Sequence, residues 1–120
     1  MKLTLLEKRL LAYCIEDYMG LWVVVGKVYG TGYNYKKELP IWVREKTMEV
    51  LLKLLSQKLI IIGTMIKGRF EPFSDSNDCI LKKIEKEWDD LGRPPNIGDT
   101  FWIIASEKGE QLAKELGLQT

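Results

Sequence analysis

The sequence predicts an α+β fold with three N-terminal helices, a two-stranded antiparallel sheet and a C-terminal helix. Apolar residues recur with helical spacing in the first half of the chain. Two short apolar runs, residues 59–66 and 101–105, have the β-branched composition of buried strands. Residues 67–99 separate these strands and contain a helix of their own, which predicts an insertion. Because 120 residues is the length of one domain, we expect residues 1–120 to fold as one.

The first helix is predicted over residues 5–18. Thr4 and Glu7 have the spacing of a capping box, which marks the start of a helix. Gly20 is predicted to end this helix, because glycine is the residue that most often follows the last turn of a helix. The apolar stripe of this helix comprises Leu6, Leu10, Leu11, Cys14, Ile15 and Tyr18.

The next segment, residues 21–29, is ambiguous. Its β-branched residues favour a strand, whereas the order of the elements favours a short helix. Periodicity does not decide so short a run, so both remain open and we expect the helix. Glycines, Asn34 and Pro40 then predict a loop over residues 30–41.

The third helix is predicted over residues 43–57. Its apolar residues follow the i, i+3, i+4, i+7 spacing of one helix face, and further apolar residues widen that face. The polar arc is correspondingly narrow. The apolar residues are Met48, Leu51, Leu52 and Leu55, with Val43, Val50 and Leu54 beside them.

The insertion is predicted to contain a polar loop over residues 67–78 and a helix over residues 78–91. Ile80, Ile84, Trp88 and Leu91 share one stripe of that helix. Gly92 ends the helix, and the two prolines that follow prevent its continuation. Ser106 is the predicted N-cap of the last helix.

Composition excludes several classes of function. The net charge is +1, and neither half of the chain has the basic excess of a typical nucleic-acid-binding protein. The chain has no histidine, which excludes histidine-based catalysis and mixed Cys/His zinc sites. We therefore expect no metal and no cofactor. Without an apolar span or a signal peptide, we expect a cytoplasmic protein with no membrane partner.

The two cysteines, Cys14 and Cys79, lie far apart in the sequence. Cys14 falls on the apolar stripe of the first helix, which favours a buried free thiol. A disulfide between the two remains open, because spacing alone does not decide it.

Two segments resemble winged-helix proteins. Residues 43–65, VREKTMEVLLKLLSQKLIIIGTM, are similar to the third helix and following strand of bacterial members. Residues 101–116, FWIIASEKGEQLAKEL, are similar to the last strand and terminal helix. The resemblance implies a winged-helix-like fold, although the insertion at 67–99 replaces the usual short hairpin loop.

A second resemblance extends over nearly the whole chain. EDYMGLW at 16–22, VREKT at 43–47 and EWDDLGRPPNIGDTFWI at 87–103 are similar to a family of small uncharacterised proteins common in cyanobacteria and other bacteria. This resemblance implies no activity, because none is assigned to that family.

The third helix is the first candidate site, because in DNA-binding winged helices it lies in the major groove. The charges on its polar arc, Glu45, Lys46, Glu49 and Lys53, sum to zero. A contact with a protein partner, which would also include Arg44, is therefore favoured over DNA. In the DNA alternative, the phosphate contacts are Lys36, Lys37, Arg44, Lys46 and Lys53.

The turn at residues 91–99 is the second candidate site. Its two prolines hold Arg93, Asn96 and Asp99 in a rigid segment. We interpret it as a partner-recognition loop or as the turn that returns the 78–91 helix to the sheet.

Most of the four tryptophans are expected in the core, with one or two available to anchor a partner: Trp22, Trp42, Trp88 and Trp102.

Together these features favour a non-enzymatic protein-interaction or regulatory domain with an unknown protein partner. The alternative is a winged-helix DNA-binding transcription regulator, which rests on the fold resemblance alone. The acidic residues of the 78–91 helix are expected to form a solvated face, and no catalytic site is expected. The amphipathic first and last helices suggest a homodimer.

Overall fold

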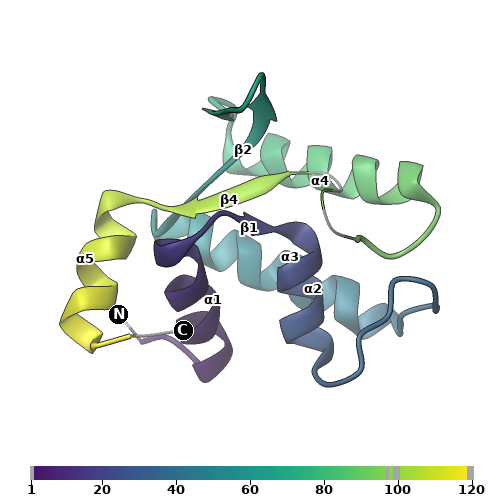
Figure 1. Ribbon diagram of the computed structural model, residues 1–120, viewed down its shortest axis with the longest axis horizontal. Helices are drawn as coiled ribbons and strands as arrows, with labels where there is room; N and C mark the ends of the chain where they lie inside the picture. The colour runs from purple at the N-terminus through teal and green to yellow at the C-terminus, as the bar shows by residue number, and fades with distance from the viewer. Residues whose placement is uncertain (1, 97, 99–100, 119–120) are drawn as a thin grey trace.

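The computed structural model describes residues 2–96, 98 and 101–118 and confirms the α+β class. An antiparallel sheet crosses the middle of the molecule; in this view α1, α2 and α3 lie below β4, α4 lies above it and α5 lies at one end (Figure 1). In chain order the elements are α1 (Leu5–Glu16), β1 (Met19–Gly20), α2 (Leu21–Tyr29), α3 (Ile41–Ser56), β2 (Ile60–Ile66), β3 (Arg69–Pro72), α4 (Asn77–Leu91), β4 (Trp102–Ala105) and α5 (Glu107–Leu116).

Among the residues that the structure describes, the sheet has four strands in the order β1-β4-β2-β3, so the prediction of two strands was wrong. The predicted pair, β2 with β4, forms its centre. Ile60 lies opposite Ala105 and Ile62 lies opposite Ile103, and these four side chains are buried. The helix-containing insertion between the two predicted strands is present, and it also supplies β3.

The strand β3 lies inside the segment predicted as a polar loop, 67–78. Lys67 and Gly68 both have positive φ, 52° and 78°, and form a two-residue turn between β2 and β3. Positive φ at both central residues is the geometry of a tight hairpin turn. The strand was missed because it has four residues, ends at Pro72 and lacks a β-branched run.

The strand β1 explains why Gly20 does not end the first helix. α1 stops at Glu16 with Asp17 as its C-cap, two residues earlier than predicted. Met19 and Gly20 then pair with Ile103 and Trp102 of β4. A side chain at position 20 would lie 2.8 Å from the Trp22 ring, so the close approach of that ring requires glycine.

The helix predictions are otherwise confirmed to within two residues. Residues 21–29 are helical. The Thr4–Glu7 capping box forms, and Ser106 accepts a hydrogen bond from the Gly109 N–H as the N-cap of α5. Gly92 ends α4 in the left-handed conformation.

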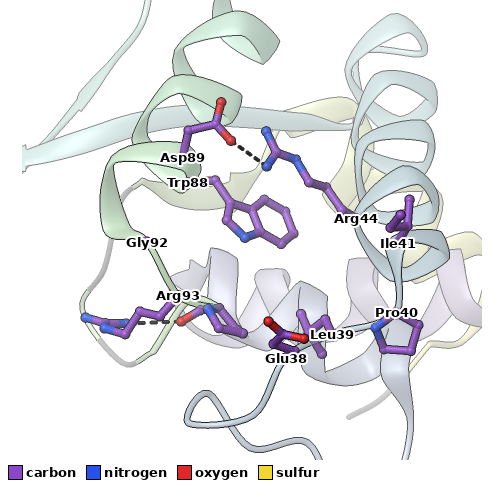
Figure 2. A pocket seen from close by; sticks show the side chains of 10 residues that line it. Glu38, Leu39, Pro40, Ile41, Arg44, Trp88, Asp89, Gly92 and Arg93 are labelled. Carbon is purple, nitrogen blue, oxygen red and sulfur yellow. Dashed lines mark hydrogen bonds and ion pairs between the residues drawn. The ribbon is translucent and has the colours of Figure 1, made fainter.

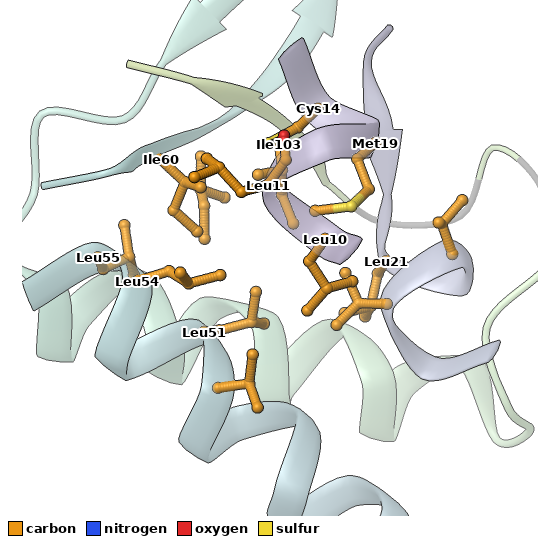
Figure 3. Packing of buried hydrophobic residues seen from close by; sticks show 14 of the residues in the cluster. Leu10, Leu11, Cys14, Met19, Leu21, Leu51, Leu54, Leu55, Ile60 and Ile103 are labelled. Carbon is orange, nitrogen blue, oxygen red and sulfur yellow. Dashed lines mark hydrogen bonds between the residues drawn. The ribbon is translucent and has the colours of Figure 1, made fainter. Parts of the chain in front are cut away.

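The core lies between the sheet and the helices (Figure 3). Leu10, Leu11 and Cys14 from α1 meet the buried strand residues, and the apolar side of α3 closes the opposite flank. α4 contributes to the same core. Its buried residues are Ile80, Ile84 and Trp88.

The N-terminal end of α5 packs directly on the backbone between α3 and β2. The Ser106 hydroxyl donates to the Lys58 carbonyl over 2.6 Å, and the Ser106 N–H donates to the Leu59 carbonyl over 3.0 Å. A Cβ atom at Gly109 would stand 2.1 Å from that Leu59 oxygen. Only glycine allows the helix to approach this closely.

We expect Gly109→Ala to lower the free energy of unfolding by about 1–3 kcal/mol, because the added methyl group overpacks the contact. At an exposed helix position the same change raises stability by about 1 kcal/mol. Urea denaturation measures the difference. The exposed neighbour Lys108→Ala, expected within about 0.5 kcal/mol of the parent, is the control. A G109A variant as stable as the parent would contradict the contact.

Candidate functional site

The helix α3 presents one side to the core and the other to solvent. It begins after Pro40, whose carbonyl accepts from the Val43 N–H over 3.0 Å. It ends before Lys58, which has a φ of 60°. Its fully buried side comprises Val43, Thr47, Val50, Leu51 and Leu54. The remaining residues decide what α3 can contact.

The helix α4 lies along one flank of α3 and is tied to it through Arg44. The Arg44 guanidinium donates to Asp89 over 2.6 Å and to the Glu85 carbonyl over 3.3 Å. It also lies 5.1 Å from the centre of the Trp88 ring (Figure 2). The hydrogen bond from Arg44 lowers the pKa of the Asp89 carboxyl. Arg44, a predicted partner or phosphate contact, is therefore engaged within the chain.

A pocket of about 370 Å³ opens where the C-terminal end of α4 meets the start of α3 (Figure 2). Trp88 forms its inner wall and the Arg44–Asp89 pair one edge. Its other walls are residues 38–41 and 92–94. The pocket thus brings the two predicted sites, α3 and the 91–99 turn, to one place.

A larger groove of about 570 Å³, the α3–α4 groove, runs beside this pocket and shares Ile41 and Arg44 with it. Four apolar side chains line the groove, and four charged residues complete its lining. The apolar residues are Ile41, Met48, Leu52 and Leu81; the charged residues are Arg44, Glu45, Glu49 and Glu85. The groove exists because α4 stands beside α3.

Large apolar side chains stand exposed along this part of α3. Ile41 is 78% exposed, Trp42 is 52% exposed and Leu52 is 41% exposed. Of the four tryptophans, Trp88 is buried, Trp22 and Trp102 are half-buried, and Trp42 is the one in solvent. Clustered exposed apolar residues of this size mark contact surfaces in folded proteins.

Lys53, predicted as a partner or phosphate contact, forms an internal ion pair. Its ammonium donates to the buried Glu7 carboxylate over 2.9 Å, and the Thr4 N–H donates to the same carboxylate over 2.7 Å. Burial acts to raise the pKa of Glu7, but these hydrogen bonds and the Lys53 charge together lower it. Lys53 therefore joins α3 to the start of α1.

The remaining candidate residues of α3 lie on its solvent side. Glu45 and Glu49 line the α3–α4 groove, and Lys46 lies within 3.5 Å of the Glu49 carboxylate. Both partners of that pair are exposed, so it stabilises the fold little.

Residues 91–96 of the predicted 91–99 turn pack on the 30–40 loop. Tyr33 donates its hydroxyl hydrogen to the Pro95 carbonyl, and the Arg93 guanidinium lies 5.5 Å from the Tyr35 ring centre. Asn96 is half-buried, and Asp99 lies outside the described residues. The turn therefore has a structural role in holding this loop.

The two lysines of the DNA alternative lie in the 30–40 loop, before α3. Lys36 and Lys37 are both exposed. The Lys36 ammonium lies 5.9 Å from the centre of the Tyr35 ring. Both cations therefore belong to the loop that the 91–99 turn holds.

Sequence reasoning missed the apolar lining of the groove. It assigned Met48 and Leu52 to the core face of the third helix, and it ended the loop at Ile41. In the structure Met48 is half-buried and packs against the core from the groove, whereas Leu52 is exposed. The unusual width of the apolar arc was the available signal. An arc that wide exceeds what one buried face of a helix needs.

Neither cysteine forms a disulfide, and their surroundings differ. Cys14 is buried, and burial raises the pKa of its thiol to about 12. Cys79 is exposed near the start of α4. Within the described residues, no three Cys, Asp or Glu side chains gather closely enough to hold a metal ion.

The difference between the cysteines predicts their reactivity. In the native protein, a disulfide reagent such as Ellman's reagent should modify Cys79 quickly and leave Cys14 unmodified, because the thiolate is the reactive species. In denaturant both thiols should react. A Cys79→Ser variant serves as the control, with no fast native thiol. Fast modification in that variant would contradict the buried placement of Cys14.

The Glu7–Lys53 pair predicts a pH-dependent effect. Because folding lowers the pKa of Glu7, its contribution is complete above the ordinary value of 4.5 and is lost as pH falls through the lowered value. At pH 7, Glu7→Gln should reduce the free energy of unfolding by about 1 kcal/mol, with the deficit shrinking in acid. Denaturation at several pH values measures it. The exposed Glu87→Gln variant should show no such dependence; a constant E7Q deficit would refute the assignment.

No family model matches the chain, and neither a curated protein nor a solved structure is significantly similar to it. No helix in the described part of the chain has the length and apolar character needed to cross a membrane.

Proposed function

We propose that this chain is a non-enzymatic interaction or regulatory domain that binds a protein partner through α3 and the α3–α4 groove. The observation that carries the proposal is the exposure of Ile41 and Leu52 in that groove, with Trp42 exposed on the adjoining side of α3. Full burial of one such side chain is more favourable than its exposure to water by about 1.5–3 kcal/mol. A partner that covers them recovers this free energy, and tryptophan is among the most frequent interface anchors.

We further propose a winged-helix-like scaffold. The order of α1, α2, α3 and β2, followed by β4 beside β2 and then α5, supports it. The β2–β3 hairpin turn, β3 and α4 then occupy the place of the wing. The kinship with small cyanobacterial-type proteins belongs to the same proposal and rests on the sequence segments alone.

A protein partner is favoured over DNA by the charges of α3. Two of its cations are held internally, Arg44 by Asp89 and Lys53 by Glu7. Glu45 and Glu49 stand on the solvent side, where they would repel phosphates. Of the cations predicted for DNA contact, Lys36, Lys37 and Lys46 are left. Three phosphate contacts give weak binding that salt largely abolishes.

Titration of the chain with mixed-sequence duplex DNA from about 20 mM to about 500 mM salt separates the two functions. We expect no binding at physiological salt and little at the lowest. Tight binding with a steep salt dependence would establish the DNA-binding alternative instead.

The protein-binding function is tested with the double variant Ile41→Lys and Leu52→Lys. Because Ile41 is 78% exposed and Leu52 is 41% exposed, stability should fall by no more than about 1 kcal/mol. A photo-crosslinking residue at position 52 should join the chain to one protein in the cells that make it. That protein, once purified, should bind the parent chain and not the double variant.

The matched control is Gln111, an exposed residue of α5. A crosslinker at position 111 should give no adduct, and Gln111→Lys should bind the purified partner like the parent chain. Equal binding by the double variant would contradict the proposed surface.

A further inference from the structure

The α3–α4 groove has an acidic rim around an apolar floor. Glu45, Glu49 and Glu85 line it, and Arg44 is the one cation that the described residues contribute to the lining. Arg44 does not offset these carboxylates, because Asp89 pairs with it at 2.6 Å. Lys46 approaches Glu49 at 3.5 Å, but both side chains are exposed and the attraction is weak. The groove therefore carries excess negative charge.

The apolar floor follows the axis of α3. Ile41, Met48 and Leu52 stand at i, i+7 and i+11 on one side of α3 and span about 16 Å of helix axis, while Leu81 faces them from α4. A groove between two helices, with apolar positions repeated at this spacing, fits the apolar face of a third helix.

We propose that the occupant of this groove is a basic amphipathic helix of a partner protein, an inference that rests on the proposed function. Its apolar residues, spaced at i, i+4, i+7 and i+11, would cover Ile41, Met48, Leu52 and Leu81. Lysine or arginine residues along its flanks would face Glu45, Glu49 and Glu85. Such charge complementarity selects the partner and steers its approach more than it adds affinity.

The chain's own helices are poorer occupants than this helix. α5 contains Glu107, Glu110 and Glu115 against Lys108 and Lys114, so it carries net negative charge. Because Glu7 is buried, the surface of α1 carries Lys8 and Arg9 against Glu16, but the apolar face of this helix is already buried in the core through Leu10, Leu11 and Cys14. Neither helix offers both a basic flank and a free apolar face, and a second copy of the chain is thus disfavoured.

The test is a display selection against the purified chain. The library consists of helical peptides of about 16 residues with leucine at i, i+4, i+7 and i+11 and with Lys, Glu or Gln at all other positions. We expect the chain to enrich peptides of net positive charge. The triple variant Glu45→Lys, Glu49→Lys and Glu85→Lys should enrich peptides of net negative charge instead.

A matched control changes the same total charge elsewhere, with Glu71→Lys, Glu87→Lys and Glu115→Lys, all at exposed positions. This control should still enrich basic peptides. A selected basic peptide should bind the groove triple variant about tenfold more weakly than it binds the parent or the control. Circular dichroism establishes that all three proteins are folded.

The other outcomes would contradict either the basic partner helix or the proposed protein-binding function. Enrichment without charge preference, lost in the I41K/L52K variant, would overturn the basic partner and leave the proposed function standing. Enrichment that survives I41K/L52K, or no enrichment at all, would overturn both. A dimer in light scattering that I41K/L52K dissociates would identify a second copy of the chain as the occupant instead.

Discussion

Trp88, Ile84 and Ile80 anchor α4 in the same core that α3 helps to form, and the rest of the surface depends on this contact. Arg44 lies between the two helices, over the Trp88 ring and bound to Asp89. Because α4 occupies this flank, the pocket at its end and the α3–α4 groove at its side both exist. Without α4, the same side of α3 would be an open helix face with no groove.

Pairing within the fold changes the charge that α3 presents. In the sequence, the lysines and glutamates of its polar arc balance. In the structure, Lys53 forms an ion pair with the buried Glu7 and Arg44 forms one with Asp89, whereas Glu45 and Glu49 face solvent. A buried carboxylate is costly unless it is paired, which accounts for Lys53 at Glu7, whereas Asp89 is exposed and its pair with Arg44 ties α4 to α3. The surface that remains is apolar with an acidic rim, which suits a cationic protein segment and repels a phosphate backbone.

Local signals made the helices predictable, and long-range contacts made the remaining features unpredictable. Thr4, Gly92 and Ser106 each satisfy backbone groups at a helix end, so their positions in the sequence located those ends. β1 and β3 have two and four residues, too few for a strand pattern, and both form because a neighbouring strand pairs with them. Periodicity placed Met48 and Leu52 on the core side of α3. It could not show that α4, which is distant in sequence, leaves part of this wide apolar arc open.

The most direct test of the central claim is a ¹H–¹⁵N chemical-shift titration of the labelled chain with a lysine-flanked amphipathic peptide. We predict that the shifted amides cluster in α3 between Ile41 and Leu52 and in α4 around Leu81 and Glu85, with α5 and the 30–40 loop unchanged. Shifts concentrated in the loop that holds Lys36 and Lys37, or spread over the sheet with α3 unaffected, would contradict it.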